Sequence, residues 1–89
     1  MKKEYFLKCW VGPGMFPDER SICFKDKDGN DISGFVWAGA VDEENGLVRV
    51  DICNETLDVF LVTNGGWELF MSRRVWVPKD AIVIKNKEK

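Results

Sequence analysis

Turn-forming residues divide this chain into short apolar runs, and that spacing restricts it to a β architecture. Clusters of Gly, Pro, Asn and Asp recur every ten to fifteen residues. These residues favour turns because they accept special backbone angles or hydrogen-bond their own backbone. The runs between them, at residues 21–24, 32–37, 47–53, 57–62, 67–71 and 75–77, are rich in β-branched and aromatic side chains. The sequence therefore predicts six or seven short strands.

Two of the runs show apolar residues at every second position, although the second run becomes apolar on both faces over residues 60–62. The charged positions are Arg49 and Asp51 in one run and Asp58 in the next. A period of two is typical of an antiparallel strand with one buried face. We therefore predict that one face carries the core. Its expected members are Val50, Ile52, Val59 and Leu61.

Helices are not expected beyond single turns. Residues 38–44 are the main helical stretch, and Gly39 with the following Asn45-Gly46 limits it to a turn or two. Residues 78–81 suit one tight 3-10 turn led by Pro78, and residues 28–30 suit a hairpin turn between two strands. Six or seven short strands without a helix bury their apolar faces as a small barrel or as two packed sheets.

The last quarter of the chain resembles the end of a Src-homology-3-like barrel. Residues 75–83 read as an apolar strand, a proline-led tight turn and a second apolar strand, which is how the closing strands of that family are joined. Residues 16–21 are loosely similar to the acidic first loop of the family. The paired tryptophans of its peptide-binding members are missing, since Trp37 and Trp67 each stand alone. The resemblance thus implies a barrel shape and not the binding of proline-rich peptides.

We accordingly expect an all-β fold, a small antiparallel Src-homology-3-like barrel. An oligonucleotide-binding-type barrel or a small sandwich is the alternative. One domain is expected over residues 1–84, followed by a polar C-terminal tail at residues 85–89.

Charge is unevenly distributed along the chain. The net charge is −2 and the isoelectric point about 5.1, which argues against general affinity for nucleic acid or anionic membranes. Residues 1–11 and 67–89 nevertheless carry nine basic and four acidic side chains, whereas residues 12–66 carry four and eleven. If strand pairing brings the two ends together, the molecule should have a basic and an acidic side.

The residue types that most enzymes and metal sites need are scarce. The chain has no histidine, which excludes general acid–base and nucleophilic catalysis through imidazole. The sequence Asp26-x-Asp28-x-Asn30 opens like a calcium loop. However, Asp31 stands where that loop needs glycine, and Trp37 stands where it needs glutamate. We expect a plain hairpin turn there, and a protein that is not an enzyme and has no cofactor and no metal.

The three cysteines indicate the compartment. Cys9, Cys23 and Cys53 form no Cys-x-x-Cys pair, so we predict no zinc site, no disulfide and thiols that behave as small hydrophobes. No apolar run has the length of a signal peptide or a membrane span. The sequence therefore predicts a cytoplasmic protein without a membrane partner.

The candidate binding residues combine arginine and tryptophan near the C-terminus. Such side chains anchor protein interfaces, and they also stack on single-stranded nucleic acid. We predict a non-catalytic protein-interaction module whose partner is another protein or a second copy of itself; the alternative is a weak nucleic-acid-binding barrel. We expect the contact surface to be a basic patch beside an exposed tryptophan. Its predicted residues are Arg73, Arg74, Trp76, Trp10 and Lys79.

Overall fold

A computed structural model describes residues 2–63 and 74–87. It contains strands and two 3-10 turns, and no α-helix occurs in these two ranges, which confirms the all-β prediction. The elements are β1 (Lys2–Lys8), β2 (Trp10–Pro13), β3 (Glu19–Lys25), β4 (Asp31–Trp37), η1 (Ala38–Ala40), β5 (Val41–Asp42), β6 (Leu47–Glu55), β7 (Val59–Thr63), β8 (Val75–Pro78), η2 (Lys79–Ala81) and β9 (Ile82–Lys87). The expected strand at residues 67–71 lies outside the described residues.

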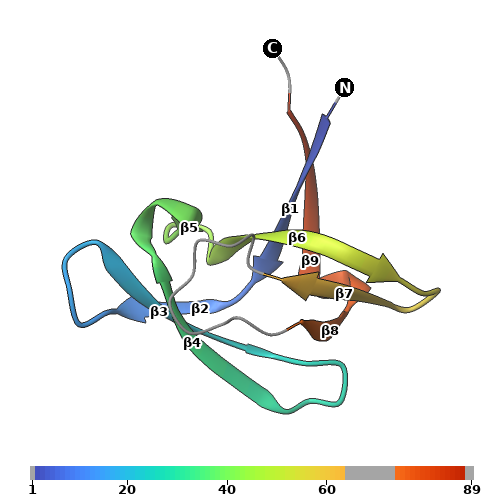
Figure 1. Ribbon diagram of the computed structural model, residues 1–89, viewed down its shortest axis with the longest axis horizontal. Coiled ribbons are helices and arrows are strands. Elements are labelled where there is room, and N and C mark those ends of the chain that lie inside the picture. The colour runs from blue at the N-terminus through green and yellow to red at the C-terminus, as the bar shows by residue number, and fades with distance from the viewer. Residues whose placement is uncertain (1, 64–73, 88–89) are drawn as a thin grey trace.

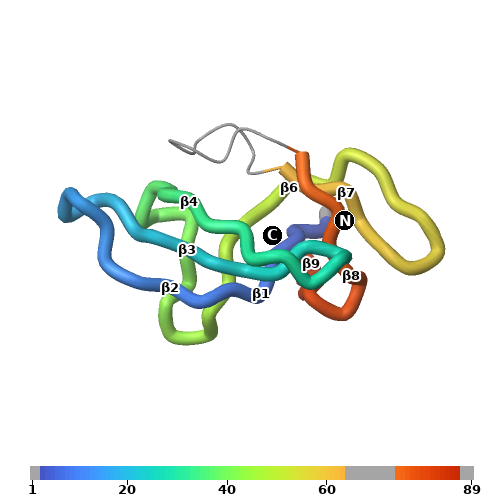
Figure 2. Tube along the Cα trace, turned by 90° about the horizontal axis from the view of Figure 1, so that it is seen from below, coloured from blue at the N-terminus to red at the C-terminus, as the bar shows by residue number. Residues whose placement is uncertain are grey.

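The strands form two antiparallel sheets. The larger has the order β8-β7-β6-β1-β9, with the short β5 also paired to β6, and the smaller has the order β2-β3-β4. Figure 1 shows the smaller sheet crossing below the larger one, and Figure 2 shows β2, β3 and β4 side by side as seen from below. Along the described chain the hydrogen-bonded path ends at β8 on one side and at β9 on the other, so these ladders do not by themselves close a barrel.

Strand pairing brings the two ends of the chain together, although the predicted N-terminal strand at residues 5–11 is divided between β1 and β2. β1 and β9 run antiparallel from Leu7 opposite Ile82 to Lys2 opposite Lys87. They project together past β6, and both chain ends lie at the tip (Figure 1). β9 therefore continues through residues 85–87, the first three positions of the expected polar tail.

The predicted turns are also present. β3 and β4 form a hairpin, and Gly29 in its turn has a φ of 84°, a backbone conformation that glycine adopts without strain. A 3-10 turn follows Pro78 as predicted, with Pro78 itself in an extended conformation as its N-cap. The helical stretch at residues 38–44 is reduced to the single turn η1.

One core lies between the two sheets. The small sheet contributes Ile22, Phe24 and Val36, and the large sheet contributes members from all five strands of its main path. The large-sheet members are Leu7, Val48, Val50, Phe60, Val62, Val77 and Ile82. Because both sheets bury residues in the same cluster, we expect them to unfold together.

The predicted face of β7 is wrong. Phe60 and Val62 are buried, whereas Val59 and Leu61 are only partly covered. The run is apolar on both faces, so alternation alone could not assign it. A register shift in the β6–β7 ladder between Ile52 and Asn54 accompanies this arrangement. Phe60 packs edge-on against the Tyr5 ring at 6.3 Å. On β6 the prediction fares better, since Val50 is buried and the half-buried Ile52 packs against the core.

Candidate interaction surface

The described members of the predicted site lie on β2, on and just before β8, and on η2. Trp10 lies on β2 with 66% of its surface exposed, and Arg74 is exposed just before β8. Trp76 is half-buried on β8, and its carbonyl accepts a hydrogen bond of 2.9 Å from the backbone N–H of Lys27. Arg73 lies outside the described residues. Of the tryptophans predicted for the site, the structure makes Trp10 the accessible one.

Lys79 forms an ion pair and a ring contact at the protein surface, where about a third of its side chain is exposed. Its Nζ lies 2.9 Å from Glu55 Oε2 and 5.0 Å from the centre of the Phe60 ring. Its backbone N–H donates to the Asp58 carbonyl at 3.1 Å. These contacts tie η2 to the turn between β6 and β7, and they pair the predicted binding residue Lys79 with a carboxylate.

The expected basic side is also interrupted by carboxylates. Glu4 on β1 lies 3.7 Å from Arg49 on β6. The pKa of Asp42 is lowered mainly by a hydrogen bond from the Asn45 side chain, and the positive charge of Lys85 contributes. Arg49 and Lys85 thus each have a carboxylate nearby, Glu4 on β1 and Asp42 on β5.

Trp10 borders two hollows, and the first lies between β2 and the C-terminal turn. It has a volume of about 290 Å³. Apolar groups make up most of its wall, and the cations Lys8 and Lys25 flank it; Lys25 pairs with Asp31 at 2.5 Å. The lining residues are Lys8, Cys9, Trp10, Phe24, Lys25, Pro78 and Ala81. We call this the Trp10 hollow.

The second hollow lies on the outer face of the small sheet, with a volume of about 340 Å³. Strand register explains its shape. Cross-strand pairing aligns Trp10 with Cys23 and Ser33 in one row, and Gly12 with Ser21 and Phe35 in the next. The rings of Trp10 and Phe35 thus lie at opposite ends of a surface formed by small side chains. Sequence reasoning missed both hollows because each depends on register and packing between segments far apart in the chain.

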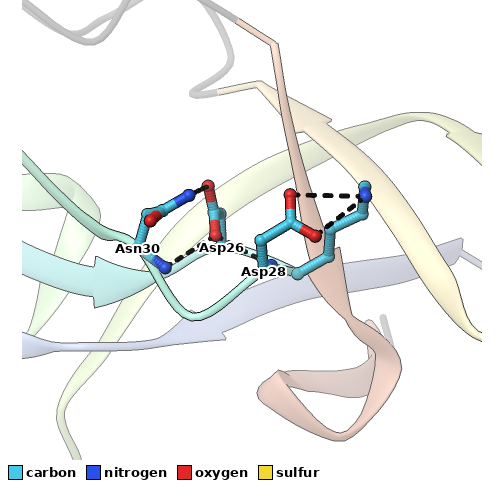
Figure 3. Close-up of polar contacts among 4 residues, drawn as sticks. Asp26, Asp28 and Asn30 are labelled. Atoms are coloured by element: carbon cyan, nitrogen blue, oxygen red, sulfur yellow. Dashed lines mark hydrogen bonds and ion pairs between the residues drawn. The ribbon is translucent and has the colours of Figure 1, made fainter.

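The turn that opens like a calcium loop uses its oxygens internally. Asp26 Oδ1 accepts hydrogen bonds from the backbone N–H groups of Asp28 and Asn30, both at 2.9 Å, and these contacts are drawn in Figure 3. Hydrogen bonding, above all from the Asn30 backbone, lowers the pKa of Asp26. No group of three or more metal-ligating residues occurs within the described ranges. The geometry is that of a side-chain-capped hairpin.

The thiols have contrasting environments. Cys9 and Cys23 are partly covered, Cys53 is exposed, and all three are free. Burial, reinforced by the neighbouring Cys23, raises the pKa of Cys9 to about 12. Cys9 therefore remains a neutral thiol at physiological pH and acts as part of the apolar wall of the Trp10 hollow.

We expect these cysteines to differ in their rate of alkylation. The thiolate is the nucleophile, so iodoacetamide at about pH 8 should modify exposed Cys53 well before Cys9. Mass spectrometry of the peptides after timed quenching measures the order, with urea-unfolded protein as the control in which all three react. Rapid labelling of Cys9 in the folded protein would contradict the burial described here. If the intact protein without reductant had a mass two hydrogen atoms below that of the reduced chain, it would contain a disulfide.

No protein-family model, curated protein or solved structure matched this chain. Within the described residues, no helix has the length and apolar character needed to cross a membrane. The function is therefore argued from the chemistry of the surface itself.

Proposed function

We propose that this protein is a non-catalytic interaction module, built as a small Src-homology-3-like barrel, that binds a protein partner through the surface around Trp10. The observation that supports the proposal most directly is the position of Trp10. Two-thirds of a large aromatic side chain is open to solvent, and it forms a wall of both hollows. Tryptophans placed among well-formed apolar pockets are frequent hot spots of protein interfaces.

Connectivity supports the barrel. The two ends of the five-strand path, β8 and β9, are consecutive in the chain. They are joined by the three-residue turn η2. A sheet whose end strands are linked by so short a turn must curl, because a flat sheet would hold them four strand spacings apart, or about 19 Å. Curling also agrees with the resemblance of residues 75–83 to the closing segment of that family.

The composition of the surface favours a protein partner. The walls of the two hollows are mainly aromatic, aliphatic and small side chains, which suit the desolvated centre of a protein interface. Specific binding of nucleic acid relies instead on many basic contacts to phosphates. The described residues around Trp10 supply Lys8 and Lys25, and the protein as a whole carries a net negative charge.

Weak binding of single-stranded nucleic acid is the second candidate function. It is favoured by one observation, the position of these two lysines beside an exposed indole ring. Base stacking on tryptophan combined with lysine–phosphate contacts is a common way of holding a single strand. A fluorescent random oligonucleotide tests this candidate, since such binding should weaken steeply as salt is raised.

We expect Trp10→Ala to weaken binding of the protein partner by about thirtyfold or more, the effect of losing a hot spot of about 2 kcal/mol. A photoreactive phenylalanine at position 10 first identifies the partner by covalent capture. Isothermal titration of the purified pair then compares the wild type with the variant. Leu57→Ala is the control, because Leu57 is 91% exposed on the turn between β6 and β7. Equal affinities for both variants would refute the assignment of this surface.

A further inference from the structure

The turn between β2 and β3 presents two large apolar side chains to solvent. Met15 is 77% exposed and Phe16 is 62% exposed. This turn, residues 14–18, lies at the end of the small sheet farthest from β8 and β9 (Figure 1), and we call it the finger. Exposing two adjacent apolar side chains to water is unfavourable, so they are candidates for contact with another molecule.

A buried carboxylate fixes the conformation of the finger. Glu19 is only 4% exposed, and its Oε1 accepts a hydrogen bond of 2.7 Å from the backbone N–H of Met15. The Glu19 backbone N–H donates to the Phe16 carbonyl at 3.0 Å. A Cβ on Gly14 would lie 2.6 Å from the Glu19 carbonyl group, so only glycine permits this approach. Burying a carboxylate is costly, and here the buried group orders an exposed loop.

Further contacts hold the base of the finger. Arg20 Nη1 donates to the Pro17 carbonyl at 2.9 Å, and Arg20 Nε lies 2.6 Å from Glu43 Oε2. The backbone N–H of Ala38 donates to the Asp18 carbonyl at 2.8 Å. A loop ordered in advance loses less conformational entropy when it binds. The finger is thus organised before any contact forms.

The finger and the Trp10 hollow complement each other in shape and charge. At about 290 Å³, the hollow lies just below the range of small-molecule sites, a size that suits one or two side chains of a partner. Its wall is apolar and its flanking charges are Lys8 and Lys25. The finger offers Met15 and Phe16 at its tip and the exposed carboxylate of Asp18, and the Glu43 carboxylate paired with Arg20 lies at its base.

We propose that the occupant of the Trp10 hollow is the finger of a second copy of this chain. The inference rests on the proposed function, because it names the partner of that same surface. Finger and hollow lie at opposite ends of β2, so two chains related by a two-fold axis can each insert a finger into the hollow of the other. Such a reciprocal contact closes on itself and yields a dimer.

Sedimentation equilibrium of the purified protein tests the contact. The wild type should dimerise reversibly, and Phe16→Asp and Lys8→Glu should each raise the dissociation constant at least about tenfold by removing an apolar anchor or reversing a flanking charge. Leu57→Asp is the control and should leave it unchanged. Circular dichroism and thermal unfolding establish that every variant is folded.

Mixing two inactive variants distinguishes this contact from general stickiness. Phe16→Asp lacks a functional finger, Trp10→Ala lacks a complete hollow, and each alone should dimerise much more weakly than the wild type. Their mixture retains one intact finger-in-hollow contact and should associate more tightly than either variant alone. A wild type that stays monomeric up to about 1 mM, where any remaining affinity is negligible, would overturn the self-contact. In that event, a different protein that is captured through position 10, and that binds Trp10→Ala at least about thirtyfold more weakly than the wild type in titration, would leave the proposed function standing. Dimerisation that is unaffected by Phe16→Asp would equally overturn the proposed contact between finger and hollow.

Discussion

Replacing Leu7 with alanine should lower the free energy of unfolding by about 2–5 kcal/mol, the usual cost of truncating a buried leucine. Leu7 has no exposed surface, and it lies on β1 between Val48 on one neighbouring strand and Ile82 on the other. Both neighbours belong to the core, so the lost side chain leaves a cavity lined from both sides. Urea denaturation followed by tryptophan fluorescence measures the change.

Leu57→Ala is the matched control for this prediction. It makes the same chemical change at a position that is 91% exposed, and exposed substitutions usually alter stability by no more than about 0.5 kcal/mol. Equal effects of the two variants would show that β1 is not the centre of the core.

Phe24→Ala should have the largest effect, about 3–5 kcal/mol, as expected for a buried aromatic side chain. Phe24 is 1% exposed and belongs to the small sheet, yet it packs in the cluster that includes Leu7 and Val77 of the large sheet. A domain of this size is stabilised by roughly 4–13 kcal/mol in total, so the variant should lose between about a quarter and all of its stability.

Phe16→Ala provides the comparison at an exposed phenylalanine, measured at low protein concentration to keep it free of self-association. It should change stability by about 0.5 kcal/mol or less. The shape of the Phe24→Ala transition is informative as well. A single transition seen by all probes means that the two sheets form one cooperative unit, whereas loss of the small sheet alone would contradict the shared core.

Strand positions were predictable because they depend on local chemistry. The spacing of turn residues located β3, β4 and β6, and the proline at position 78 located the tight turn between β8 and β9. The face of β7 was not predictable in the same way. Residues 60–62 are all apolar, so burial of Phe60 and Val62 instead of Leu61 is decided by what lies opposite them in the ladder.

The candidate site shows the same limit. Exposure of Trp10 follows from its position on a strand whose neighbours are small residues, and that requires the pairing of β2 with β3 and of β3 with β4. Lys79 was assigned to a basic patch from its sequence neighbours, but its partner Glu55 is 24 residues away in the chain. Long-range pairings of this kind leave no signal in a single sequence.

The ribbon of β1 and β9 has a practical meaning for how this protein can be attached to other molecules. Its last rung places Lys2 opposite Lys87, and in an antiparallel pair such residues are about 5 Å apart. The described chain therefore enters and leaves at one point, away from the finger (Figure 1). The domain could accordingly be spliced into a surface loop of a host protein through two short linkers, with the host held away from the finger.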